Sequence, residues 1–215
     1  MAEFALSNFL EDEILNHFFR NSAASAVAPE VALFLQPAGN VFTTTFAADQ
    51  IDDTAHGLAN DAVITLSNSG GALPAGLLAA TRYYVINSNA NDFQVSLTHG
   101  GAAETFTDDG TGTHSWHDFL AEDKTGQTEA SGNGYAQQSV TFAAPTTSGD
   151  RRQVQNSAAV TFTASGGDLG GGEISTMAIF DATTNMLSAV PITPVTVADG
   201  NTLRFDVNQI TQQMS

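Results

Sequence analysis

The chain has 215 residues, of which 42% are hydrophobic and only 13% are charged, with 6 Lys and Arg against 23 Asp and Glu and a net charge of −17. We expect so acidic a chain to repel nucleic acid and anionic membranes, because phosphate binding needs clustered Lys and Arg. It contains no Cys, which excludes disulfides and thiolate metal sites. Its start has no basic stretch before an apolar run, and no apolar segment reaches ~18 residues, so we expect a cytoplasmically made protein without signal peptide or membrane span.

The first predicted element is a helix over Leu6–Arg20, which Ser7 or Asn8 is placed to cap. Acidic residues fill its first turns, where the helix dipole favours them. Hydrophobic residues recur every four positions and spread beyond one face, so this helix needs cover on two sides. It either lies across its own sheet or packs partly against a neighbouring subunit. The candidate interface residues are Phe9, Leu10, Ile14, Phe18 and Phe19.

The pattern changes after the first predicted strand, Val31–Leu35. The segment that follows is rich in Gly, Asn and Thr and has a strand-and-turn rhythm of its own. We therefore predict two domains, one spliced into a loop of the other. Residues 1–40 and 118–215 form the host β domain, and residues 41–117 form the inserted β domain.

Within the insert, short alternating or apolar runs are separated by glycine-rich turns, of which Gly70-Gly71 is one. The predicted strands are Phe42–Phe46, Ala62–Leu66, Tyr83–Asn87, Phe93–Leu97, Thr105–Thr107 and Thr113–His117. The third and fourth strands are predicted to form one hairpin, and the last two another. Their near-regular spacing favours a small sandwich or barrel.

The host resumes with a polar loop and is then all β. Its predicted strands are Tyr135–Phe142, Ala158–Thr163, Ile174–Phe180, Met186–Ile192 and Thr202–Val207. A polar loop containing Arg151 and Arg152 separates the first two. The predicted host core includes Phe34, Phe142, Phe162, Phe180 and Phe205. The fold expected for the whole chain is mainly β: a β-sandwich host with an N-terminal helix, carrying an inserted small β-sandwich or barrel.

Six stretches of the host follow one another in a distinctive order, among them ALSNFLEDEILNHFFRN at residues 5–21 and TEASGNGYAQQSVTF at residues 128–142. The other four are residues 31–34, 156–162, 177–182 and 199–205. The series resembles a family of tailed-phage virion proteins often labelled tail-fibre or minor structural proteins. Members of that family join the first strand to the Glu-Ala-Ser-Gly stretch by a short loop, so the insert is a departure from it.

The insert has a resemblance of its own. Five of its stretches are similar, in order, to a small β module of many phage structural proteins: Ala55–Leu58, Leu73–Leu77, Tyr83–Asn87, Asp92–Leu97 and Gly110–His114. This resemblance implies a virion context without indicating one position in the virion.

No set of residues predicts catalysis. His114 and His117 would form a metal pair on a helix, but they flank Trp116 on a predicted strand, so we expect packing instead. The acidic turn at Asp108-Asp109-Gly110 lacks the spacing of an EF-hand. Glycine-rich stretches lack the lysine of a phosphate-binding loop. We therefore expect no enzymatic activity, no cofactor and no bound metal.

The function expected is a non-enzymatic structural role in a tailed-phage particle made in a bacterial cytoplasm. The absence of a fibre-like repeat or coiled coil, together with the acidity of the chain, favours a capsid decoration (cement) protein. It would bind the major capsid protein on the head surface as a homo-oligomer, expected to be a trimer. The alternative is a tail-fibre or baseplate component with tail or baseplate partners, and a carbohydrate-binding or hydrolytic receptor module is a third class.

Overall fold

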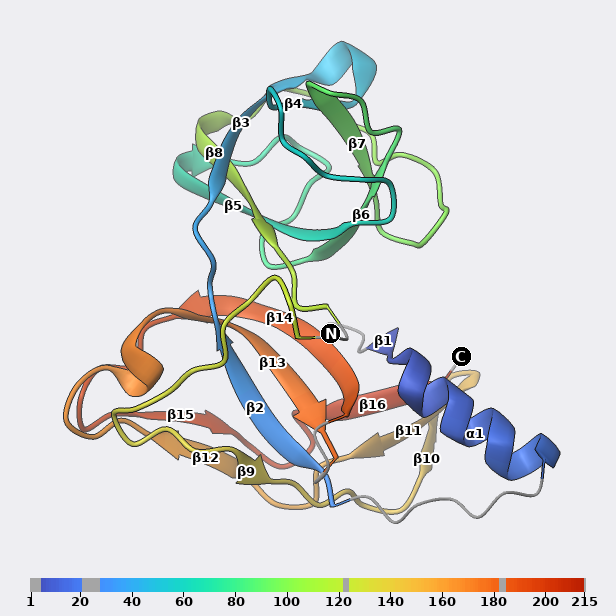
Figure 1. Ribbon diagram of the computed structural model, residues 1–215, viewed down its shortest axis with the longest axis vertical. Coiled ribbons are helices and arrows are strands. Elements are labelled where there is room, and N and C mark those ends of the chain that lie inside the picture. Colours follow the sequence, from blue (N-terminus) through green and yellow to red (C-terminus); the bar gives the residue numbers. More distant parts are fainter. Residues whose placement is uncertain (1–4, 21–27, 122–123, 182–184, 215) are drawn as a thin grey trace. The chain divides into compact units, whose positions relative to one another are not determined.

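A computed structural model describes residues 5–20, 28–121, 124–181 and 185–214. Strands dominate these residues, and the N-terminal α-helix is α1 (Asn8–Arg20), so the predicted mainly β class is confirmed (Figure 1). The chain divides into two compact units. The first contains residues 1–36, 122–190 and 194–215, and the second contains residues 37–121 and 191–193. Within the described ranges, no helix combines the length and the hydrophobicity needed to cross a membrane.

The second unit is a closed barrel with strand order β3-β4-β7-β6-β5-β8, in which all neighbours pair antiparallel. Its strands are β3 (Asn40–Thr45), β4 (Gln50–Asp52), β5 (Val63–Ala72), β6 (Arg82–Ile86), β7 (Asp92–Ser96) and β8 (Thr111–Asp118), with a 3₁₀ turn at Phe46–Ala48. The first and last strands are neighbours, and Asn40 pairs with Trp116. This confirms the predicted small β-barrel.

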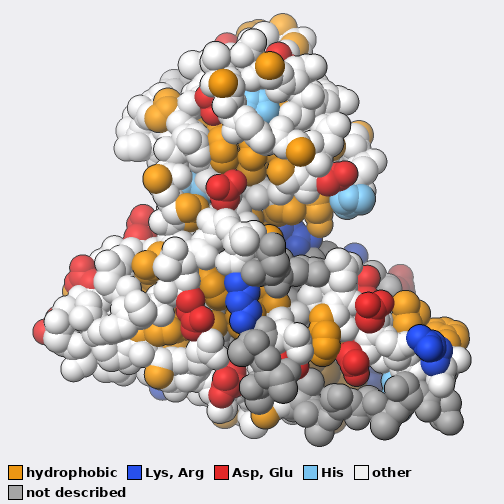
Figure 2. Space-filling model, viewed as in Figure 1, with side chains coloured by type: hydrophobic (Ala, Val, Ile, Leu, Met, Phe, Trp, Pro, Cys, Tyr) orange, Lys and Arg blue, Asp and Glu red, His pale blue; other side chains and the backbone are white. Residues whose placement is uncertain are grey.

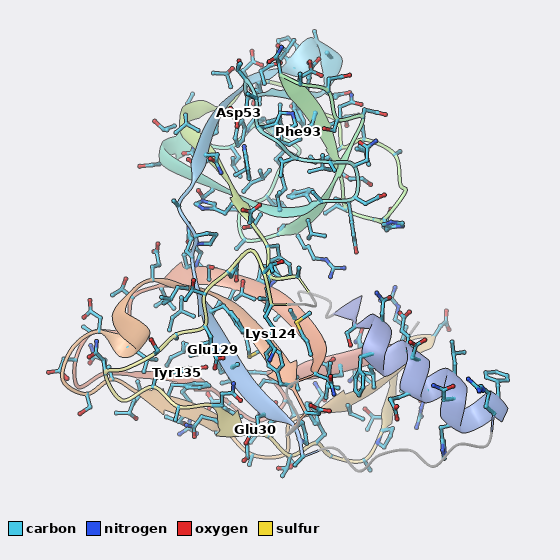
Figure 3. All side chains as sticks on the ribbon, in the orientation of Figure 1. Glu30, Asp53, Phe93, Lys124, Glu129 and Tyr135 are labelled. Atoms are coloured by element: carbon cyan, nitrogen blue, oxygen red, sulfur yellow. The ribbon has the colours of Figure 1, made fainter. Side chains whose placement is uncertain are left out.

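Side chains from every strand of the barrel meet in one apolar core. The fully buried members are Ile51, Ile64, Leu66, Tyr83, Val85, Phe93 and Val95, each at most 2% exposed. At the edge of this core the indole Nε1 of Trp116 donates to the Asp53 carboxylate at 2.8 Å. Figure 3 labels Asp53 and Phe93 in this unit. Closure leaves no strand of the barrel with an unpaired edge.

Two predicted details of the barrel are wrong. β5 runs through Gly70 and Gly71, which were predicted to turn, and its pairing with β8 shifts between Ser69 and Ala72. Gly70 has a φ of 79°, so this glycine supplies a bulge inside a strand. Thr105–Thr107 forms no strand, and β8 pairs with β3 and β5 instead. Local pattern could not show this, because barrel closure joins segments far apart in the sequence.

The first unit is built on a five-stranded sheet in the order β1-β14-β13-β2-β9. These strands are β1 (Ala5–Leu6), β2 (Glu30–Leu35), β9 (Gln138–Ser139), β13 (Ile174–Phe180) and β14 (Met186–Val195). All seven residues of β13 are buried, so both faces of the sheet are covered there. The predicted sandwich is therefore confirmed.

Two smaller sheets complete the first unit, in the orders β10-β11-β16 and β12-β15. Their strands are β10 (Thr146–Ser148), β11 (Arg151–Gln155), β12 (Val160–Thr163), β15 (Thr202–Phe205) and β16 (Thr211–Met214), with a 3₁₀ turn at Leu169–Gly171. The prediction of a loop around Arg151 is therefore wrong. Of the five phenylalanines predicted as host core, Phe34, Phe162 and Phe180 are buried, whereas Phe142 and Phe205 are half-buried.

The predicted strand Tyr135–Phe142 is wrong except for the two residues of β9. Tyr135, the first residue of that range, is partly buried. Its hydroxyl accepts the N–H of Leu33 at 3.0 Å and donates to Glu129 at 2.8 Å (Figure 3). The ring of Tyr135 stacks on Phe162 of β12, with centroids 6.0 Å apart. Burial raises the pKa of Tyr135 well above its ordinary value. Tyr135 therefore links the sheet that contains β2 to the sheet that contains β12, in place of the strand pairing that was expected.

Candidate interaction surface

Helix α1 begins directly after Ser7, a buried residue whose Oγ accepts the N–H of Leu10 at 3.2 Å. The predicted start at Leu6 is too early, because Leu6 lies in β1 and pairs with Ser188 of β14. The N–H of Ser7 also donates to the carbonyl of Leu187, in the same strand, at 3.0 Å. The helix is therefore attached to the five-stranded sheet at its N-terminal end.

The five candidate interface residues have different environments. Leu10 and Ile14 are half-buried and line a cavity in the first unit. Phe9 is half-buried but is not among the residues that line it. Phe19 is 81% exposed, which is the largest value among the exposed hydrophobic side chains described. The side chain of Phe18 lies outside the described residues.

Leu15 was not among the candidate interface residues, yet it is 52% exposed and lies one turn before Phe19. We call Leu15 and Phe19 the outer stripe of the helix, and Leu10 and Ile14 the inner stripe. Successive helical residues are rotated by about 100°, so the two stripes are separated by roughly 140° around the helix axis. The helix therefore has one apolar stripe towards its own unit and another towards solvent.

The cavity beside the inner stripe has a volume of about 510 Å³. Its apolar lining includes Leu10, Ile14, Phe142, Val154, Ile179 and Leu187. These residues come from α1, β11, β13, β14 and a loop, so the cavity marks the place where the helix, the five-stranded sheet and the β10-β11-β16 sheet meet. Its volume falls in the range of protein sites that enclose a ligand or several side chains.

Three polar groups of the cavity wall can donate hydrogen bonds. The guanidinium of Arg152 is exposed and donates to two neutral acceptors, Thr147 Oγ1 at 2.7 Å and the Pro145 carbonyl at 3.1 Å. Gln212 Nε2 and Ser188 Oγ are buried, with no hydrogen-bond partner in the part of the chain that the structure describes. Of the three groups, the guanidinium of the exposed Arg152 is the one that an incoming acceptor can reach, and a carboxylate is the acceptor that pairs with it most strongly.

Acidic side chains greatly outnumber basic ones in this chain. In Figure 2 red acidic side chains are scattered over the visible face and blue basic ones are few, as the net charge of −17 requires. Arg151 and Arg152 are two of the six basic residues and are neighbours on β11. The cavity therefore has a cation at its wall in a chain that is otherwise strongly acidic.

The histidines considered as a metal pair are placed apart by the structure. They are three residues apart on β8, so they lie on opposite faces of the strand. His114 is buried, stacks on Phe42 and has its Nδ1 2.7 Å from Asn68 Nδ2, whereas His117 Nε2 lies 2.8 Å from Ser67 Oγ. Across the described ranges, no group of three His, Cys, Asp or Glu side chains is placed to hold a metal ion.

Comparison with known families bears on the first unit. Residues 117–213 match a family model described as podophage GP4 fiber I protein gp80. The match covers somewhat less than half of the chain and shows that this segment is similar to a phage fibre protein. The predicted resemblance to tail-fibre or minor structural proteins of phages is thereby confirmed. No curated protein and no solved structure matched the chain.

The matched segment begins near the end of β8 and contains β9 to β15 and all of β16 except its last residue. It therefore supplies the strand side of the cavity, including Arg152, Val154 and Gln212. Helix α1 and nearly all of the barrel lie outside the matched residues. The cavity thus joins a wall from the matched segment to a helix that the match does not include.

Proposed function

We propose that this protein is a non-enzymatic structural component of the fibre or tail apparatus of a tailed-phage particle. The observation that carries the proposal is the match of residues 117–213 to a phage fibre family. It favours the tail-fibre alternative over the expected capsid decoration role, because the description of the matched family names a fibre protein. The partners proposed are accordingly tail or baseplate proteins.

Several residues of the matched segment hold its loops in place, which agrees with a structural role. Glu129 accepts hydrogen bonds from the Tyr135 hydroxyl and from Gln137 Nε2, both at 2.8 Å. Gly134 has a φ of 83°, and a side chain there would meet the carbonyl oxygen of Thr163. Within residues 128–142, Glu129, Gly134 and Tyr135 thus have structural roles, and this agrees with a structural function for the segment.

The barrel supports a modular version of the same proposal. It is a closed unit with its own core, and nearly all of it lies outside the residues that match the fibre family. We infer that it is an addition to a fibre framework. On this view the first unit attaches the protein to the particle, and the barrel supplies a further surface.

The test is to locate the protein in purified phage particles. A tag at the C-terminus, labelled with gold and imaged by electron microscopy, should place it at the tail, with a copy number far below that of the major capsid protein. Labelling of the major capsid protein in the same particles is the control. Gold spread over the head, with a copy number comparable to that of the major capsid protein, would replace this proposal with the decoration role.

A further inference from the structure

We propose that the outer stripe of α1 in one copy inserts into the cavity of a second copy, so that the protein assembles head-to-tail. This interface goes beyond the proposed function and does not depend on where in the particle the protein lies. Three properties of the molecule support this interface: the limited reach of the helix within one copy, the apolar fit, and the charges.

The first property is that a copy cannot place its own outer stripe in its own cavity. Leu10 and Ile14 already face the cavity from the same rigid helix. Leu15 and Phe19 are rotated roughly 140° away from them around the axis. Turning the outer stripe inward would withdraw the inner stripe and break the cap at Ser7. A second copy is the source that presents the same stripe without this conflict.

The second property is that the outer stripe, which projects from one copy, and the cavity, which is the recess of the other, are both apolar. Phe19 is 81% exposed and Leu15 is 52% exposed, and they lie one helical turn apart. The cavity of about 510 Å³ is lined mainly by aliphatic and aromatic side chains. An exposed Phe and an open apolar cavity each leave apolar surface in contact with water, and one contact between them removes both areas from water.

The third property is that the charges around the two surfaces are opposite. Glu11 and Asp12 are exposed and lie within about 40° of the outer stripe around the helix. The cavity wall carries Arg152, an exposed residue whose guanidinium is bonded only to neutral acceptors among the hydrogen bonds described. A carboxylate arriving next to the outer stripe would accept from this wall in a charge-assisted hydrogen bond.

The symmetry of the contact follows from where the two surfaces lie. The outer stripe and the cavity are different parts of one copy, so the contact is heterologous. Each copy offers one projection and one recess, and the chain of contacts either closes into a ring, such as the expected trimer, or continues as a filament. A two-fold contact between identical helix faces would need no cavity.

The decisive test separates projection from recess in two variants. Phe19→Ser removes the projection and keeps the cavity, and Val154→Trp fills the cavity and keeps the projection. Each variant alone should be monomeric, and an equimolar mixture should form a one-to-one dimer and stop there, because a single intact contact remains. Sedimentation equilibrium at about 0.15 M salt or above, where repulsion between acidic copies is screened, measures this.

The matched control is Leu78→Ser, which removes a hydrophobic side chain 64% exposed on the barrel and should associate like the wild type. Loss of the Phe19 contact should raise the dissociation constant by about ten- to a hundredfold. If Val154→Trp fails to fold, as judged by its melting curve, Arg152→Glu replaces it. That change places an acid against Glu11 and Asp12 at an exposed position.

Crosslinking gives an independent answer, because the chain has no native Cys. Copies carrying Phe19→Cys mixed with copies carrying Val154→Cys should be joined by a short bifunctional thiol reagent, and copies carrying Leu78→Cys should not be joined to Val154→Cys. A wild type that stays monomeric at all concentrations overturns the proposal. A dissociation constant that Phe19→Ser leaves unchanged, or variants that fail to combine when mixed, would overturn it as well.

Discussion

The two units of this protein bury their apolar surface to different extents. The barrel closes on itself, pairs every strand on both sides and encloses one core. Among its described residues, the first unit has sheets that do not close, a helix with an exposed apolar stripe, and a cavity next to that helix. A unit that buries its own apolar core needs no partner for that purpose. A unit with an exposed apolar stripe and an apolar cavity is the one where a partner is expected to bind.

The largest effect is expected in the barrel core. Phe93 is fully buried, and its ring lies 4.9 Å from that of His56. Phe93→Ala should destabilise the barrel by about 3–5 kcal/mol and lower its melting temperature by more than about 10 °C. Calorimetry measures this, with Phe46→Ala, at a residue 47% exposed, as the control. Equal losses in the two variants would mean that the barrel core is not closed as described.

A smaller effect is expected where the first unit depends on one hydroxyl. Tyr135→Phe leaves the N–H of Leu33 without its acceptor and removes a donor from Glu129. The cost should be about 1–3 kcal/mol, because a buried group is left unpaired. Urea unfolding measures it, and Tyr84→Phe, which removes a half-buried hydroxyl that accepts from Arg82, is the matched control with the smaller loss.

The same tyrosine predicts the pH dependence of stability. Burial raises the pKa of Tyr135, and of Tyr83 in the barrel core, above the ordinary value of about 10. The folded protein then keeps protons that the unfolded chain releases, so this stabilisation is complete below about pH 10 and is lost as the pH rises through the folded-state pKa values. Urea midpoints recorded between about pH 9 and 11 should fall, and Tyr135→Phe should reduce the slope. An unchanged slope would mean that the phenol is not buried.

The smallest effect tests whether the two units are independent. Replacing residues 41–117 with a short Gly/Ser loop should leave the first unit folded with a nearly unchanged melting temperature, because the barrel core draws its residues from within the replaced segment. Circular dichroism and melting of the shortened chain measure this. An unfolded product would show that the barrel is part of the folding unit of the host and that the two units are not independent.

What the sequence predicted well was set by local pattern. Ile174–Phe180 is an apolar run bounded by glycine and turn residues, and it forms β13 with those bounds. The strands β11 and β16 were missed because their residues are mostly Gln, Thr and Arg, which show no buried face. Their pairing is made across more than fifty residues, and no local pattern carries that information.

The candidate surface was predicted only on the side of the helix. The periodicity of residues 6–20 selected Leu10 and Ile14, because a helix repeats every 3.6 residues. The cavity opposite them is assembled from separate strands, so its lining at Val154, Ile179 and Leu187 was beyond reach from the sequence. Leu15 could have been selected from the sequence. When one stripe of a helix already packs on its own unit, a second stripe of apolar residues indicates a second contact surface.

The pairing of Asn40 with Trp116 has a consequence for the history of such proteins. Antiparallel neighbours lie about 5 Å apart, so the chain enters and leaves the barrel at adjacent points. A host domain needs only a surface loop to accept an inserted domain whose ends are adjacent. Another domain with similarly adjacent ends could replace the barrel in a single recombination event. Such an insertion site would let the inserted domain vary between related proteins while the host domain stays the same.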